Sequence, residues 1–280
     1  MAAALSQTEI LLAADLSVRF GANPPLLNHV RLEIQKGEVL GLVGQSGSGK
    51  STLAMALLGL LDRRRVHVEG TIKFQDHDLL VLGERGLRQM RGRTLALVLQ
   101  SPLSSLNPAL RVRTQLREAW RAHASGSKAD CENAIRAALE SVSLPSADEF
   151  LRKYPAQMSV GQAQRVLIAM AVIHRPALLI ADEATSALDV ITQSEILALF
   201  AKLNHDTGMA MLYISHDLAS VAGLCHRIAI LHQGEVVECG VSEQIFARPQ
   251  HKYTRQLMAA LPQMPRHSAG LKTDAAAAAR

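Results

Sequence analysis

Eight residues near position 50 constrain the fold more than any other part of this 280-residue chain. The segment 44–51 reads Gly-Gln-Ser-Gly-Ser-Gly-Lys-Ser and fits the pattern G-x-x-x-x-G-K-[ST], in which a loop surrounds phosphates with backbone N–H groups. A continuous apolar run at 38–43 precedes this loop, and a helical pattern at 51–61 follows it. The strand–loop–helix order predicts an α/β fold with a central parallel sheet and a phosphate-binding loop.

Each residue type in this phosphate loop has a separate task. Glycines let the backbone approach a phosphate closely, and the helix that begins near Lys50 adds its positive end. The Lys50 ammonium can reach the β- and γ-phosphates, and the Ser51 hydroxyl can ligate Mg²⁺. The residues that we predict to bind the phosphates are Gly44, Gln45, Ser46, Gly47, Ser48, Gly49, Lys50, Ser51 and Thr52.

A second apolar strand pattern ends in two carboxylates. Residues 178–183 read Leu-Leu-Ile-Ala-Asp-Glu, so Asp182 and Glu183 lie where the strand ends. Asp182 can hold the Mg²⁺ shell, and Glu183 can polarise an attacking water as a general base. Taken alone, the same pattern is typical of an ordinary acidic turn after a core strand, with no catalytic role. Together with the phosphate loop, the pair predicts a Mg²⁺-dependent nucleoside triphosphatase, without saying which kind.

The remaining patterns suggest a sheet domain interrupted by helices. Apolar or alternating segments predict strands, namely 9–20, 29–34, 70–74, 94–99, 178–182, 210–215 and 227–232. Segments with Ala, Leu and Arg at helical spacing predict helices, namely 109–123, 129–142, 160–174 and 190–204. Residues 263–280 have the low complexity of a tail.

Composition excludes several classes of protein. Aromatic residues are only 3%, which argues against a surface that stacks nucleic-acid bases, so we expect no nucleic-acid partner. Three cysteines without a CxxC pair favour a reduced compartment. The longest apolar runs, such as 166–173, are far shorter than the ~20 residues of a membrane helix. We therefore expect any membrane role to come through a partner.

The residues after the helical patterns carry a family resemblance. Residues 158–162, Met-Ser-Val-Gly-Gln, resemble the L-S-G-G-Q signature motif of ATP-binding cassette (ABC) ATPases. Residues 186–189 resemble that family's D-loop, and residues 214–217 resemble its switch-histidine segment. Gln100 matches the Q-loop glutamine, and Phe20 falls where the family places an aromatic ring against adenine. The resemblance covers roughly residues 9–250, with the motifs in the family's order.

The resemblance implies a P-loop NTPase fold of class α/β. Its parts are a RecA-like core, an antiparallel β subdomain and an inserted α-helical subdomain. The boundaries that we expect are 1–262 for the nucleotide-binding domain, 1–100 and 176–250 for the core, 101–175 for the helical subdomain, 251–262 for a C-terminal extension and 263–280 for a disordered tail.

The resemblance also implies a head-to-tail dimer that sandwiches each ATP. In it, the phosphate loop of one subunit faces the signature motif of the other. The residues implied to contact nucleotide besides the phosphate loop are Phe20, Asp182, Ser159, Gly161, Gln162 and Asp189. The implied catalytic residues are Glu183, His216, Gln100 and Lys50, and the implied Mg²⁺ ligands are Ser51, Gln100 and Asp182.

Two further segments resemble the branch of the family that imports oligopeptides, dipeptides and nickel. Residues 100–108 resemble its Q-D-P-x-x-S-L-N-P stretch, and residues 251–262 resemble its H-P-Y-T-x-x-L…P extension. This implies an ATPase subunit bound peripherally to the cytoplasmic face of the inner membrane, powering uptake of peptides or a related solute. The implied partners are transmembrane permease subunits, a second ABC ATPase subunit and, indirectly, an extracytoplasmic solute-binding protein. The alternative is an ABC ATPase of a non-transport complex, in phosphonate degradation, DNA repair or translation.

One departure from the signature motif bears on the dimer. Val160 stands where the motif has its first glycine, and a β-branched residue restricts the backbone there. We hypothesise that this signature still binds ATP, but less tightly, as in an asymmetric heterodimer of cassettes.

Overall fold

The computed structural model describes residues 9–260, so the tail predicted at 263–280 lies outside the described residues. The first of its two sheets is antiparallel, with the strand order β2-β1-β4-β5. Its strands are β1 (Ile10–Phe20), β2 (Leu27–Gln35), β4 (Val66–Phe74) and β5 (His77–Asp78).

The second sheet is mostly parallel, and the predicted site residues follow the C-terminal ends of its strands. Its order is β10-β9-β3-β8-β7-β6; all neighbours are parallel except β10 with β9. Its strands are β3 (Val39–Val43), β6 (Leu95–Val98), β7 (Leu178–Asp182), β8 (Ala210–Ser215), β9 (Arg227–His232) and β10 (Glu235–Val241). Because parallel strands end at one edge, the loops after β3, β6, β7 and β8 emerge together.

The second sheet separates two hydrophobic cores. On β3, Leu40 and Leu42 face a core shared with the antiparallel sheet and helix α1 (Lys50–Leu57). Val39 and Val43 face the other core, which includes residues of α8 (Val190–Thr207) and of the helical block. Burial on both faces explains why this strand has no alternation of polar residues.

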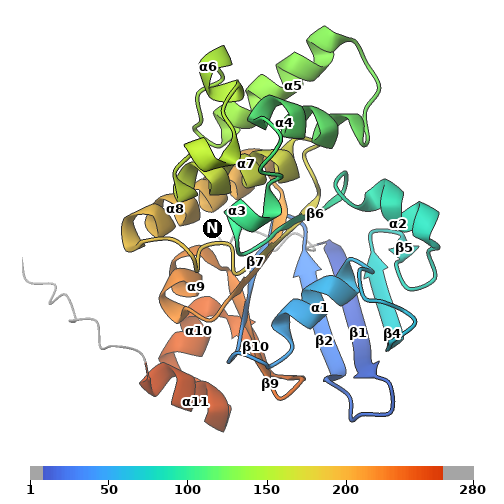
Figure 1. The fold of residues 1–280 in the computed structure, drawn as a ribbon. Helices are drawn as coiled ribbons and strands as arrows, with labels where there is room; N and C mark the ends of the chain where they lie inside the picture. Colours follow the sequence, from blue (N-terminus) through green and yellow to red (C-terminus); the bar gives the residue numbers. More distant parts are fainter. Residues whose placement is uncertain (1–8, 261–280) are drawn as a thin grey trace, which may run out of the picture.

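The elements between residues 102 and 172 are all helical. They are α3 (Pro102–Ser105), α4 (Val112–Arg121), α5 (Lys128–Ser141), α6 (Asp148–Leu151), the 3₁₀ turn η1 (Pro155–Gln157) and α7 (Val160–Val172). Figure 1 shows α4–α7 gathered at the top of the molecule, away from β1, β2 and β4 at its lower right. None of the described helices is both long and apolar enough to span a bilayer.

Several predicted boundaries are wrong, and one error has a clear cause. The helix predicted at 51–61 ends at Leu57, because Gly59 takes a positive φ of 61° there. Gly59 N–H donates to Ala56 O and Leu60 N–H to Met55 O, the hydrogen-bond pair of a Schellman cap. The strand predicted at 70–74 begins earlier, at Val66.

The sequence reading also missed short elements. They are α2 (Glu84–Met90), α9 (Leu218–Leu224), α10 (Ser242–Ala247), α11 (Lys252–Ala259) and the edge strand β10. The four helices span eight residues or fewer, which is too short for a clear helical pattern, and β10 reads Glu-Val-Val-Glu-Cys-Gly-Val, without strict alternation.

Candidate nucleotide site

The phosphate loop joins β3 to α1 through glycines that no other residue could replace without strain. Gly47 and Gly49 have φ values of 81° and 105°, a region that side chains disfavour. A Cβ on Gly44 would overlap the carbonyl oxygen of Leu231, and one on Gly49 would lie 2.5 Å from Leu27 Cδ2. The loop is therefore held tightly between the end of β9 and the start of β2.

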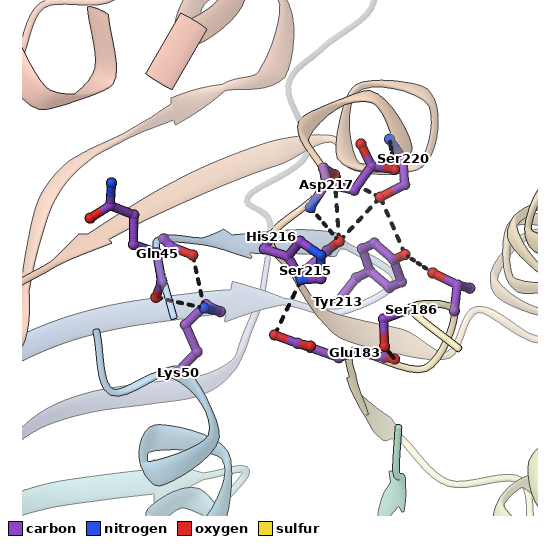
Figure 2. A network of polar contacts seen from close by, with 11 residues as sticks. Gln45, Lys50, Glu183, Ser186, Tyr213, Ser215, His216, Asp217 and Ser220 are labelled. Carbon is purple, nitrogen blue, oxygen red and sulfur yellow. Dashed lines mark hydrogen bonds and ion pairs between the residues drawn. The ribbon is translucent and has the colours of Figure 1, made fainter. Parts of the chain in front are cut away.

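Lys50 is buried beneath this loop, with its side chain only slightly exposed. Its Nζ donates hydrogen bonds to the carbonyl oxygens of Gly44, at 2.8 Å, and Gln45, at 3.0 Å (Figure 2). Burial lowers the pKa of Lys50, while the carboxylates of Glu183 and Asp182 act in the opposite direction. The ammonium thus lies inside the loop, where it can turn to a phosphate.

Asp182, the last residue of β7, has the environment of a cation ligand. Its Oδ1 is buried and has no hydrogen-bond partner among the described residues. Burial raises the pKa of this carboxyl, and a hydrogen bond with the Ser51 side chain opposes that effect. A buried oxygen without a partner is costly unless a ligand engages it, so the pair Ser51 and Asp182 fits a Mg²⁺ ion.

Glu183 and His216 face each other from neighbouring loops. His216 Nδ1 lies 3.4 Å from Glu183 Oε1, and Figure 2 shows the two side chains pointing toward one another. Glu183 adopts a positive φ of 48°, and its N–H donates to the carbonyl oxygen of Ile214 at 3.0 Å. A non-glycine residue in this conformation is strained, which is common at functional sites.

The signature residues form a capped helix end. Ser159 Oγ accepts from the N–H of Gln162 at 3.2 Å, and Gln162 Oε1 accepts from the N–H of Ser159 at 3.2 Å, closing a capping box at the start of α7. A Cβ on Gly161 would lie 2.7 Å from Thr192 Cγ2. The signature glycine therefore packs directly on α8.

Asp189 holds the start of α8 in the same neighbourhood. Its carboxylate accepts from the N–H groups of Ile191, at 3.1 Å, and Thr192, at 3.0 Å, and from Thr192 Oγ1, at 2.7 Å. These hydrogen bonds, first among them that of the Thr192 N–H, hold the pKa of Asp189 below its usual value. Among residues 9–260, no hydrogen bond or ion pair joins Ser159, Gly161, Gln162 or Asp189 to the phosphate loop.

Comparison with known families decides what this arrangement is. The model of the family described as ABC transporter matches residues 27–186, which include the phosphate loop, the signature residues and both strand-end carboxylates. The chain belongs to the ABC transporter family. The resemblance stated from the motifs is thereby confirmed.

Three relatives of the cassette are named for transport or import. The dipeptide transport ATP-binding protein DppD of Haemophilus influenzae is 41% identical and covers 89% of this chain and 76% of its own length. The peptidoglycan transport ATP-binding protein YejF of Agrobacterium fabrum is 42% identical over 92% of this chain and 48% of its own length. The glutathione import ATP-binding protein GsiA of Escherichia coli K12 is 39% identical, with 93% and 43% covered. The cassette spans about half the length of the last two relatives.

Solved ABC cassettes share the predicted fold. The dimeric cassette MJ0796 in a post-hydrolysis state, bound to ADP and phosphate, has a TM-score of 0.71 at 27% identity and covers 82% of this chain and 98% of its own. The cassette cbiO1 of Clostridium perfringens has a TM-score of 0.75 at 24% identity, with 91% and 96% covered. The α/β P-loop fold expected from the sequence is therefore confirmed, and the cassette is an ATP-binding protein.

The structure places the remaining predicted residues at the ends of β1 and β6, in the phosphate loop and in α1. Gln100 is exposed and follows β6, whose partner strand β7 carries Asp182. Phe20 is exposed at the end of β1, and the hairpin that follows it brings Leu27 against the phosphate loop. Ser46 is exposed in the loop, and Thr52 lies in the first turn of α1.

Sequence reasoning missed a series of buried hydroxyls beside the loops that carry Glu183 and His216. Tyr213 Oη lies 2.9 Å from Thr185 Oγ1 and 3.3 Å from Ser220 Oγ, and burial raises its pKa (Figure 2). Ser220 Oγ in turn lies 3.3 Å from Ser215 Oγ, which accepts from the N–H of Asp217 at 2.9 Å. These hydroxyl contacts connect Thr185, which follows the Glu183 loop, to Ser215 and Asp217, the two residues that flank His216. Their only sequence signal was a tyrosine inside an apolar strand.

Proposed function

We propose that this chain is the ATP-hydrolysing subunit of an ABC importer that energises uptake of peptides or a related solute through separate membrane subunits. The juxtaposition of Glu183 and His216 at 3.4 Å, beside the loop that buries Lys50, is the observation that carries the hydrolysis step. The dipeptide and glutathione relatives, at 41% and 39% identity, support the class of solute.

In the proposed mechanism, the phosphate loop binds and orients ATP. Lys50 exchanges the carbonyl oxygens of Gly44 and Gln45 for phosphate oxygens, and the backbone N–H groups of the loop complete the anion site. Ser51, Asp182 and Gln100 would hold Mg²⁺, which supplies neutralisation of the phosphate charge. Phe20 would stack on the adenine ring.

Glu183 acts on the attacking water. Its carboxylate accepts a proton from the water as the oxygen bonds to the γ-phosphorus and the bond to ADP breaks. His216 contacts the γ-phosphate and, through its 3.4 Å contact, orients the Glu183 carboxylate. The hydroxyl contacts of Tyr213 fix the position of the Glu183 loop relative to the His216 loop.

The proposal includes a second cassette. Ser159, Gly161, Gln162 and Asp189 would contact the ATP held by the partner's phosphate loop, since the helix end at Ser159 offers N–H groups to a γ-phosphate. The dimeric state of the MJ0796 cassette supports such an arrangement. Val160 suits an asymmetric heterodimer, in which this signature binds ATP less tightly.

The proposed assembly and division of the chain follow from the branch resemblance. The subunit would lie peripherally at the cytoplasmic face of the inner membrane, on transmembrane permease subunits served by an extracytoplasmic solute-binding protein. We propose residues 101–175 as the helical subdomain within a core of 1–100 and 176–250, followed by the extension 251–262.

A non-transport ABC complex is the second candidate. The relatives reported above are named for transport or import, which favours the importer. Purification of the tagged chain from membranes separates the two: hydrophobic permease-like subunits should accompany an importer, and their absence would favour the alternative.

Replacing the proposed base tests the hydrolysis step. Glu183→Gln should lower ATP hydrolysis by about 10²–10⁴-fold and trap an ATP-bound dimer, because the water is no longer deprotonated while ATP still binds. Phosphate release and size-exclusion chromatography with ATP measure the two effects. Glu149→Gln, an exposed glutamate of α6, is the matched control. Hydrolysis at the wild-type rate in Glu183→Gln would refute the assignment.

A further inference from the structure

Tyr253 connects the C-terminal extension to the phosphate loop, 208 residues away in the chain. It lies in the first turn of α11 and is almost completely buried. Its hydroxyl accepts a hydrogen bond from the backbone N–H of Gln45 at 3.2 Å. Its ring stacks on His232 at the end of β9, with the ring centroids 3.7 Å apart and the planes at 21°.

The position of the Tyr253 ring is determined by hydrogen bonds at the start of α11. Glu238 of β10 accepts from the N–H groups of Gln250, at 2.8 Å, and His251, at 2.9 Å. Partial burial raises the pKa of Glu238, but these N–H groups and the nearby His251 hold it below its usual value. His251 Nδ1 then accepts from the Tyr253 N–H at 3.2 Å. The extension is thus fastened to β10 before it reaches the loop.

In the phosphate loop, the neighbours of the extension contact Gly44 and Gln45, the two residues whose carbonyl oxygens accept from Lys50. Leu231, next to His232, packs its carbonyl against Gly44, where only a hydrogen fits. Gln45 is bonded in two directions: its N–H donates to Tyr253, and its carbonyl oxygen accepts from Lys50 at 3.0 Å. A change at Tyr253 therefore reaches the backbone that positions the Lys50 ammonium.

We propose that Tyr253 is a positioning residue for the phosphate loop, so that docking of the extension and binding of nucleotide phosphates strengthen each other. Thermodynamic linkage makes this coupling reciprocal. If the Tyr253 contact strengthens nucleotide binding by a given factor, bound nucleotide strengthens docking of α11 by the same factor. The inference rests on the proposed function, in that the loop 44–51 must be the phosphate site.

The experiment removes only the hydroxyl. Tyr253→Phe keeps the ring that stacks on His232 but frees the Gln45 N–H, and we expect about three- to tenfold weaker binding of ADP, the size of one hydrogen bond. Isothermal titration calorimetry with ADP measures this. Tyr154→Phe is the matched control, because the Tyr154 hydroxyl accepts from Arg111 within the helical block and should leave ADP binding unchanged.

Hydrogen exchange gives a second readout, and its measurement on the wild-type protein does not depend on the variant folding. ADP should slow amide exchange in residues 250–259, and Tyr253→Phe should abolish that coupling while speeding exchange at Gln45. Wild-type affinity or tighter binding in Tyr253→Phe, or no effect of ADP on residues 250–259, would overturn the inference. Failure of the wild-type protein to bind ADP would instead refute the phosphate-site assignment on which it rests.

Discussion

The two regions proposed to face ATP are built in opposite ways. The phosphate-loop region, defined as residues 44–51 with Asp182 and Glu183, buries Lys50 and Asp182, and Lys50 donates to carbonyl oxygens of its own loop. The signature region, defined as residues 159–162 and 189–192, leaves apolar side chains in solvent. Val160, Val190 and Ile191 are 39%, 82% and 75% exposed.

This difference separates the contacts that one chain makes by itself, around the phosphate loop, from surfaces that it leaves open, around the signature residues. The phosphate-loop region is organised before nucleotide arrives, because neighbouring strands supply its contacts. In the signature region, Ser159 Oγ already accepts from Gln162 N–H, yet its own O–H remains available as a donor. The exposed apolar residues beside it are what an interface to a second cassette would cover.

Among the variants that separate the two regions, the largest effect is expected from a change in the phosphate-loop region. Lys50→Ala should lower ATP hydrolysis by on the order of 10²–10³-fold and weaken ADP binding to a single cassette, because the charge that meets the phosphates is lost. Phosphate release and calorimetry with ADP measure both effects. Lys128→Ala, which removes an exposed lysine at the start of α5, is the control.

The same measurement on the signature region should give the opposite result. Ser159→Ala should leave ADP binding to a single cassette unchanged while lowering ATP hydrolysis, since Ser159 would act only on a partner's ATP. Its lost cap lowers helix stability by about 1 kcal/mol. Weakened ADP binding in Ser159→Ala would contradict the division into two regions.

The sequence predicted the phosphate-loop region better than its surroundings, for a physical reason. Residues 38–51 specify a strand, a loop and a helix start through contacts between near neighbours, and the 178–183 pattern does the same for the two carboxylates. Gly59 shows where this local prediction fails. The apolar run Ala56-Leu57-Leu58 continues the helical pattern, but the cap formed at Gly59 ends the helix at Leu57.

Long-range contacts outside the motifs could not be predicted from the sequence. The Gln45–Tyr253 hydrogen bond joins residues 208 positions apart, and the Thr185–Tyr213 bond depends on the pairing of β7 with β8. Neither leaves a periodic pattern in the sequence, because each depends on how the strands are ordered in the sheet. The resemblance to ABC ATPases supplied that order for the motif residues only.

A smaller effect tests the signature region itself. Val160→Gly restores the glycine of the motif and removes the β-branched restriction at the first residue of α7, so ATP-driven self-association should strengthen about three- to tenfold. Sedimentation with ATP in the Glu183→Gln background measures the dissociation constant.

The control for that experiment is Val81→Gly, which makes the same change at a residue 82% exposed in a turn outside both regions. Self-association that is unchanged in Val160→Gly would show that Val160 is not what weakens the signature, and the proposed asymmetry would then need another cause.

The smallest expected effect compares one carboxylate from each region. Burial raises the pKa of Asp182, so the folded protein is penalised for the ionised form as pH rises above about 4, the ordinary Asp range. Asp182→Asn should therefore raise the Tm of nucleotide-free protein in EDTA by about 2–4 °C at pH 7, and by less at pH 4. Thermal unfolding at the two pH values measures the difference.

Asp189 should respond with the opposite sign. Hydrogen bonds from the Thr192 N–H and hydroxyl lower its pKa, so its stabilising contribution is present above the ordinary Asp range and lost as pH falls through the lowered value. Asp189→Asn should leave Tm unchanged or lower it at pH 7, because asparagine caps a helix as well but carries no charge toward the N–H groups. Equal rises in Tm for both variants would mean that burial does not separate the two regions. The exposed Asp189 would then carry the same penalty as the buried Asp182, which the hydrogen bonds at the start of α8 argue against.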